Sequence, residues 1–149
     1  MLSRGIKLVG ALASPLFVLG GCVISPGSAL APEQSQVEFF DVIEQTQQLV
    51  GGSWETSDDP SARSCVIPFA TEGERWSALR ISADPADPRD ALAAVTASWS
   101  ELGYATLRTD IGPVGQVQGE SEFGQVLVFR VSEAAMTLQG ESECLPAPE

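Results

Sequence analysis

Histidine is absent from this chain, and lysine occurs once, at position 7. Because histidine is the usual proton carrier near neutral pH, serine–histidine and cysteine–histidine catalytic pairs are excluded, as are histidine metal sites. The sequence also lacks a P-loop, a GxGxxG fingerprint and a GxSxG motif. Paired carboxylates remain a catalytic arrangement that the 20 acidic residues would allow. We expect no enzymatic activity, no catalytic residue, no bound metal and no cofactor.

Positive charge is scarce as well: 8 basic residues stand against 20 acidic ones, for a net charge of −12. Nucleic-acid binding depends on neutralising phosphates with cations, so we exclude nucleic acid as a partner. A polybasic patch that could hold anionic lipid headgroups is missing too. Any attachment to a membrane must therefore come from another source.

No apolar run approaches the roughly 20 residues that cross a bilayer. The longest, Leu8 to Gly20, follows Arg4 and Lys7 and leads into Leu19-Gly20-Gly21-Cys22. A basic start, a short apolar run and small residues at its end describe a secretory signal. Leucine, two small residues and then cysteine resemble the signal of bacterial lipoproteins. This resemblance implies that Cys22 carries a diacylglycerol on its sulfur and that the chain is cut before it.

The expected organisation has three parts. Residues 1–21 form a lipoprotein signal peptide, residues 22–34 the lipidated cysteine with a flexible tether, and residues 35–149 one domain. The protein is then exported and held to the cell membrane by lipid, with its domain on the extracytoplasmic side. All six basic residues after Cys22 are arginine, so serine–lysine chemistry is also excluded. The alternative is ordinary secretion with a chance cysteine.

Once Cys22 is assigned to lipid, Cys65 and Cys144 remain as an even pair. Exported proteins fold in compartments that permit disulfides, so we expect these two cysteines to be joined. The loop closed would contain about 80 residues, worth at most roughly 4.5 kcal/mol of stability. Two buried free thiols are the alternative.

The apolar pattern predicts two helices and about six strands. Residues 35–50 read as a helix that opens with a Ser35–Glu38 capping box and ends at Gly51. A second helix starts at Asp87 and ends at Gly103, with Leu92, Val95, Trp99 and Leu102 on its apolar stripe. The expected strands are 65–70, 75–82, 104–111, 114–119, 125–131 and 134–143. The element order α-β-β-α-β-β-β-β and the short links predict an α+β fold, a mainly antiparallel sheet with both helices on one face.

The chain also resembles the small LppA-like lipoproteins of actinobacterial envelopes. The resemblance is carried by the lipobox with Cys22, a short tether, a first helix, Trp54 in the loop after it, and the widely spaced Cys65 and Cys144. It implies a globular domain held at the cell surface. No catalytic motif comes with this group.

The face of the sheet away from the helices is the most promising binding surface. Alternation along the predicted strands places Arg80, Arg108 and Arg130 together on a polar face. The glutamine and threonine side chains expected near them are Thr106, Gln116, Gln118, Thr137 and Gln139. Guanidinium groups favour carboxylate or phosphate partners. The alternative is a solvated face whose arginines pair with acidic neighbours. Trp54, in its loop, is a further candidate for ligand contact.

The sequence therefore predicts a membrane-anchored envelope lipoprotein that acts as a non-enzymatic binding module for an envelope protein. One alternative is a carrier or sensor for a small ligand held between helices and sheet. Another is a hydrolase built on carboxylates.

Replacing Cys22 with serine tests the anchor. The variant lacks the acylated sulfur, so the protein should move from the membrane fraction to soluble material when cells are fractionated. The parent chain, prepared in parallel, is the control. Retention of Cys22→Ser in the membrane fraction would disprove lipidation at this residue.

Overall fold

The computed structural model describes residues 31–67 and 72–147. Two helices lie in this part, α1 (Pro32–Val50) and α2 (Pro88–Glu101). The strands are β1 (Glu55–Thr56), β2 (Arg63–Val66), β3 (Glu72–Arg75), β4 (Ser77–Ser82), β5 (Ala105–Ile111), β6 (Val114–Glu120), β7 (Val126–Val131), β8 (Met136–Glu141) and β9 (Leu145–Pro146). The predicted signal peptide, Cys22 and most of the predicted tether lie outside the described residues. Neither α1 nor α2 is long and apolar enough to cross a membrane.

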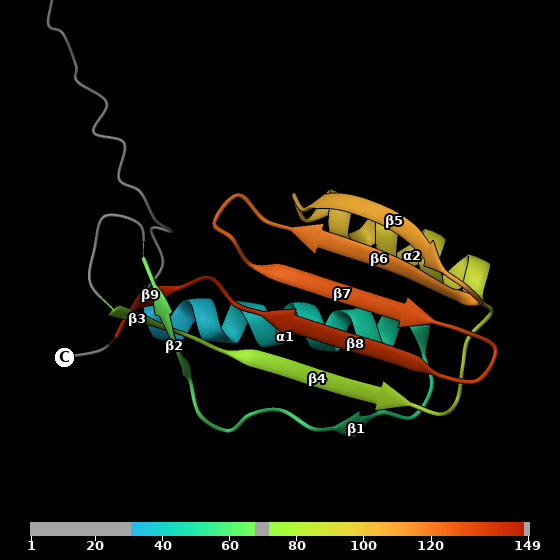
Figure 1. The fold of residues 1–149 in the computed structure, drawn as a ribbon, viewed down its shortest axis with the longest axis horizontal. Helices are drawn as coiled ribbons and strands as arrows, with labels where there is room; N and C mark the ends of the chain where they lie inside the picture. Colours follow the sequence, from blue (N-terminus) through green and yellow to red (C-terminus); the bar gives the residue numbers. More distant parts are fainter. Residues whose placement is uncertain (1–30, 68–71, 148–149) are drawn as a thin grey trace, which may run out of the picture.

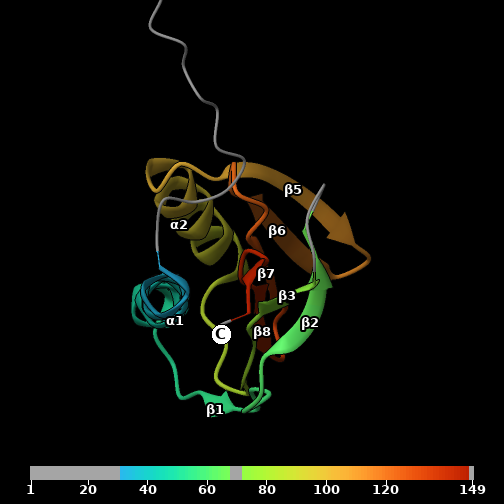
Figure 2. The same ribbon diagram turned by 90° about the vertical axis from the view of Figure 1, so that its left-hand side faces the viewer.

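The main sheet has six strands in the order β1-β4-β8-β7-β6-β5, and every neighbouring pair is antiparallel. Strands β5 to β8 follow one another as a meander, as the short links predicted. Both helices pack against one face of this sheet, and Figure 2 shows them together on one side of it. The predicted α+β class, with two helices on one face of an antiparallel sheet, is confirmed.

A second, three-stranded sheet lies at one end of the domain, in the order β2-β3-β9 (Figure 1). The sequence predicted one strand over 75–82, but the structure divides this region at Trp76. Residues before Trp76 belong to the small sheet and residues after it to the main sheet. The backbone N–H of Trp76 donates to Ser142 Oγ, 2.8 Å away, and its carbonyl accepts from the Ser142 N–H. These bonds fix the bend between the two sheets.

Helix α1 begins at Pro32, before the predicted capping residue Ser35. Proline suits the first turn of a helix because its missing N–H would have no partner there. Ser35 is instead buried within the helix, where its hydroxyl donates to Glu143 Oε1 at 2.6 Å. The predicted end is confirmed: Gly51 has a φ of 72° and donates its N–H to the Gln47 carbonyl.

Helix α2 starts as predicted, because Asp87 Oδ1 accepts from the backbone N–H groups of Arg89 and Asp90 at 3.0 and 3.1 Å. Leu92, Val95 and Trp99 are buried against the sheet. Leu102 is not part of this core. It lies just beyond the last helical turn and is 48% exposed, since the apolar stripe ends where the helix does.

Three strand glycines allow the helices to lie close to the sheet. A Cβ atom on Gly140 would stand 2.9 Å from the Phe39 ring of α1, and one on Gly119 would stand 2.9 Å from the Trp99 ring of α2. Gly115 meets Leu92 in the same way. Phe39 and Trp99 are fully buried as a result, and Trp99 Nε1 donates to Thr46 Oγ1 of α1 at 3.0 Å. Phe39 and Trp99, two of the largest core side chains, thus pack directly against the glycine backbone of the strands.

Gly140→Ala should lower the free energy of unfolding by about 1–3 kcal/mol, because the added methyl group overpacks the contact with Phe39 and Leu127. Chemical denaturation followed by tryptophan fluorescence measures the change. Thr137→Ala on the opposite face of the same strand is the matched control and should cost less than about 1 kcal/mol. Equal losses in the two variants would show that the glycine contact has no special role.

Candidate functional site

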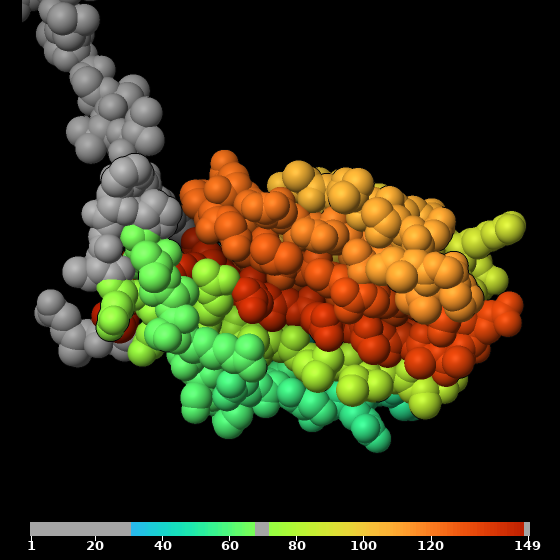
Figure 3. All heavy atoms as spheres, in the orientation of Figure 1, coloured from blue at the N-terminus to red at the C-terminus, as the bar shows by residue number. Residues whose placement is uncertain are grey.

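The uncovered face of the main sheet, called here the open face, is formed by alternate residues of five strands. Cross-strand register places these residues together: Ser77, Leu79, Ile81, Thr137, Gln139, Glu141, Val126, Val128, Arg130, Val114, Gln116, Gln118, Glu120, Ala105, Leu107, Thr109 and Ile111. Each is half-buried or exposed. The face mixes aliphatic side chains with amides and hydroxyls and carries few charges. Figure 3 looks onto it.

Most acidic side chains of the helices point elsewhere. Helix α1 exposes Glu33, Glu38, Asp41 and Glu44, and α2 exposes Asp90 and Glu101. On the open face, Glu141 is already paired with Arg75, whose Nη1 lies 2.7 Å from Glu141 Oε2. The two helices therefore expose six carboxylates to solvent, whereas the open-face residues named above include two carboxylates, Glu120 and Glu141, and one arginine, Arg130.

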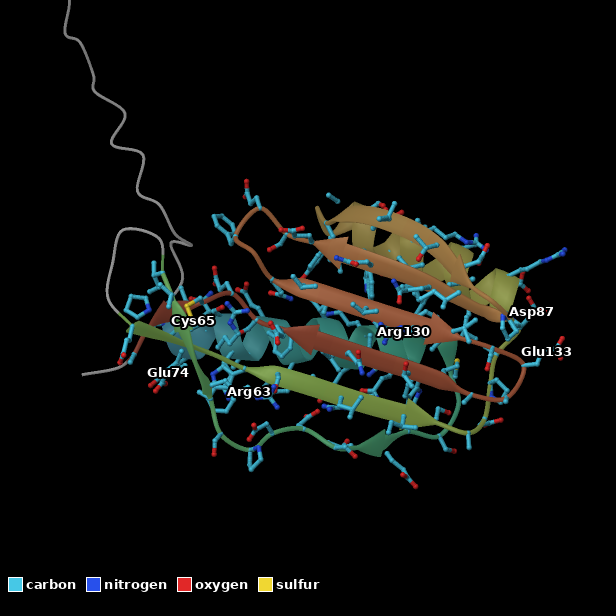
Figure 4. All side chains as sticks on the ribbon, viewed as in Figure 1. Arg63, Cys65, Glu74, Asp87, Arg130 and Glu133 are labelled. Atoms are coloured by element: carbon cyan, nitrogen blue, oxygen red, sulfur yellow. A yellow bond between two sulfur atoms is a disulfide. The ribbon has the colours of Figure 1, made fainter. Side chains whose placement is uncertain are left out.

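Arg130 lies on β7 and is the open face's one arginine (Figure 4). Its Nε donates to Gln116 Oε1 at 2.7 Å, and its Nη1 donates to Gln139 Oε1 at 3.0 Å. These neutral amides on both neighbouring strands orient the half-buried guanidinium without neutralising it. Within residues 31–67 and 72–147, Arg130 forms no ion pair, and its Nη2 group has no hydrogen-bond partner. This amino group is available to a carboxylate.

A hollow of about 390 Å³ lies on the same face, although Arg130 itself does not line it. Its floor is open-face residues Leu79, Val126, Val128 and Gln139, and its rim includes Arg63 and Asp59. Gln139 belongs to both features, since its amide oxygen also accepts from Arg130. In Figure 3 the green atoms of β2 and the loop before it border the sheet at this end. Hydrogen bonds from the Ser61 N–H and from Arg63 hold the pKa of Asp59 below its usual range, so this rim carboxylate is ionised at neutral pH.

The sequence placed Arg80 and Arg108 on the same face as Arg130, and the structure shows this to be wrong. Arg80 pairs in register with Leu138, and Arg108 with Val117, so both share the helix-covered face with these core residues. Arg80 is 6% exposed and forms an ion pair with Asp58, which also accepts from the Leu79 N–H. These two contacts of Asp58 therefore hold the loop between β1 and β2 against strand β4. Arg108 lies exposed on the edge strand β5.

Trp54 packs against the core, and its Nε1 donates to the Gly51 carbonyl at 2.9 Å. Its indole N–H is therefore already satisfied within the protein. The predicted disulfide is present: Cys65 of β2 is joined to Cys144, with their Cα atoms 6.0 Å apart and 79 residues apart in sequence. Cys144 directly precedes β9, so this bond covalently links the two outer strands of the small sheet, β2 and β9.

Sequence reasoning missed two features of the site. It identified Gln116 and Gln139 as polar neighbours but gave no signal that they would hold Arg130 from both sides. It also missed a group around Tyr104, where the hydroxyl accepts from Gln125 Nε2 beside the buried Glu143. Burial raises the pKa of Tyr104 to about 12, and the negative charge of Glu38 adds to this effect. Among the described residues, no group of three or more acidic or cysteine side chains is arranged to hold a metal ion.

Comparison with known proteins shows a similar fold and no assigned activity. No family model matches the chain, and no curated protein matches it. A solved structure, a DUF4853 family protein from Actinomyces odontolyticus ATCC 17982, superposes with a TM-score of 0.54 at 20% sequence identity. The match covers 79% of this chain and 65% of that chain, so the protein spans less than two thirds of its structural neighbour. This similarity supports the fold alone.

Tyr104 is the chain's single tyrosine, so its ionisation can be followed directly. The phenolate absorbance of the folded protein should appear with a midpoint of about 12, against the ordinary value of 10.0 for the unfolded chain. A raised folded-state pKa favours the protonated form, so the stability it contributes is present below pH 10 and is lost as the pH rises through 12.

Glu38→Gln should lower that midpoint only partly, because burial is the larger cause. Tryptophan fluorescence recorded in the same titration confirms that the chain remains folded. A folded protein that ionises at the ordinary value would contradict the buried environment of Tyr104.

Proposed function

We propose that this protein is an envelope lipoprotein, held to the membrane through lipid on Cys22, whose domain acts as a non-enzymatic binding module. Its binding surface is the open face. Its partner is an envelope protein that presents a carboxylate among apolar side chains. The proposal of a binding role without catalysis draws on the absence of histidine and on the scarcity of lysine.

The observation that carries the proposal is the state of Arg130. The chain holds 20 acidic residues, so an arginine could readily be placed beside a carboxylate. Three arginines of the described part are paired this way, namely Arg63, Arg75 and Arg80. Arg130 is instead half-buried between two glutamines. Planar guanidinium groups held in this manner bind carboxylates through charge-assisted hydrogen bonds.

The surroundings of Arg130 favour a protein partner. Val128, Leu79 and Ile81 lie in neighbouring rows of the same face and offer apolar contact next to the charge. A cation with aliphatic side chains nearby on the same face is an arrangement in which interfaces concentrate affinity.

The hollow beside Gln139 supports a second candidate, a small ligand with a carboxylate. Its volume of about 390 Å³ lies within the range of small-molecule sites, roughly 300–1,000 Å³. The sequence predicts a small ligand between the helices and the sheet, but Phe39, Trp99 and other fully buried side chains fill that space.

Site-specific photocrosslinking in intact cells tests the proposed surface. A crosslinker at Thr137, opposite Arg130 on the open face, should capture a defined envelope protein. A crosslinker at Gln48, exposed on α1, should not capture it. Arg130→Gln should lower capture from Thr137 about tenfold or more, because hydrogen bonds to a charged group contribute roughly 1.5–3 kcal/mol.

Arg89→Gln is the matched control, since Arg89 is exposed on α2 and forms no ion pair with any described residue. It should leave capture unchanged. Equal capture from Gln48, or capture from Thr137 that Arg130→Gln leaves intact, would disprove the role of the open face. If no protein is captured and a small carboxylate co-purifies with this protein, the result would favour the ligand candidate.

A further inference from the structure

The edge strand β5 (Ala105–Ile111) is an unusually open surface. It is the last strand of the main sheet and pairs with β6 alone within the described residues. All of its residues except Thr106 are exposed, and Leu107 and Ile111 are 61% and 58% exposed. Edge strands are usually protected by charged side chains, by inward-pointing charges, by a proline, by a bulge or by a covering loop. β5 has no proline, no lysine and no bulge from Ala105 to Ile111, but it carries one charge of each sign, Arg108 and Asp110, on the helix-covered face. These charges oppose pairing with another strand unless that strand matches them.

The backbone groups that face away from β6 follow from the turn. Gly112 and Pro113 form a two-residue link between Ile111 and Val114, and Gly112 has the φ of 60° that its first position requires. In such a hairpin the closing pair, here Ile111 and Val114, is hydrogen-bonded, and bonded pairs alternate along the ladder. The N–H and C=O groups of Thr106, Arg108 and Asp110 therefore point outward, ready to pair with another strand.

The sequence of β5 is complementary to itself in the antiparallel sense. Around Thr109 it reads Leu107-Arg108-Thr109-Asp110-Ile111. When two copies are paired with Thr109 opposite Thr109, Arg108 faces Asp110 of the other copy and Leu107 faces Ile111. Arg108 and Asp110 are both outward-bonding residues, so this register also satisfies the backbone. The neighbouring registers that keep this bonding place Arg108 on Arg108 or Asp110 on Asp110, which cross-strand repulsion disfavours.

We infer that the protein forms a symmetric dimer through β5, with Thr109 on the two-fold axis. The dimer interface then holds two Arg108–Asp110 ion pairs on the helical side and two Leu107–Ile111 contacts on the open-face side. The axis is perpendicular to the sheet, so both open faces look in the same direction and join into one continuous sheet. This inference stands whatever the open face binds.

Cysteine crosslinking of the full-length protein in its own membrane tests the register. Opposed residues in a non-hydrogen-bonded pair have Cα atoms about 4.5 Å apart, within reach of a disulfide. Thr109→Cys should therefore form a disulfide-linked dimer with itself on a non-reducing gel. Leu107→Cys is the matched control on the same face. Its copies would lie roughly 14 Å apart along the strands, too far to link.

Co-expression of Leu107→Cys with Ile111→Cys should restore the linked dimer, because these two residues face each other in the proposed register. Mass spectrometry identifies the linked peptides and separates them from the native Cys65–Cys144 bond. A Thr109→Cys protein that links no more than Leu107→Cys would overturn the inference, as would linkage equal at all three positions.

A charge exchange supplies a second measurement that needs no cysteine. Arg108→Asp or Asp110→Arg alone places like charges opposite each other and should weaken dimerisation roughly tenfold, as judged by analytical ultracentrifugation of the detergent-extracted protein. The double variant Arg108→Asp with Asp110→Arg recreates the opposite pairing and should recover dimerisation. Failure of the double variant to recover, while each single variant remains folded by circular dichroism, would also overturn the inference.

Discussion

The close contact between helix side chains and strand glycines is the constraint on which the remaining architecture depends. Phe39 and Trp99 reach full burial because Gly140 and Gly119 leave room for their rings. This contact commits one face of the sheet to the helices and leaves the other uncovered. The meander from β5 to β8 agrees with this arrangement, because its antiparallel register aligns the core-facing residues of all four strands on one face. Which face of the sheet stays uncovered is thus linked to where the strands carry glycine.

The distribution of charge follows from the same division. Carboxylates occupy the solvent side of α1 and α2, where they need no partner. On the sheet, Arg75 is paired with Glu141 and Arg80 with Asp58, and Arg130 is held by amides. The exposed carboxylates of the helices and the amide-held arginine of the open face give the two sides of the domain a different electrostatic character.

Local signals in the sequence predicted the fold class, the meander, the Asp87 cap and the cysteine pair. The faces of the strands could not be predicted so simply. Around Arg80 the large residues Leu79 and Ile81 face outward, while Ala78 and Ser82 lie under the helices. The sequence assigned polar residues to the open face, but in β4 the helix-covered positions are Ala78, Arg80 and Ser82, which are small or charged. The division of the predicted strand at Trp76 and the hydrogen bond from Ser35 to Glu143 both depend on residues that are distant in the sequence.

The position of the disulfide determines how the domain bears a mechanical load. A pull applied at Pro32, where α1 begins, acts on a helix whose first turn is hydrogen-bonded through Ser35 to Glu143. Glu143 is the immediate neighbour of Cys144, which is covalently joined to Cys65. Tension applied at the start of α1 therefore reaches a region closed by the disulfide before it reaches the long ladders of the main sheet. The open face is thus shielded from a load applied at this end of the domain.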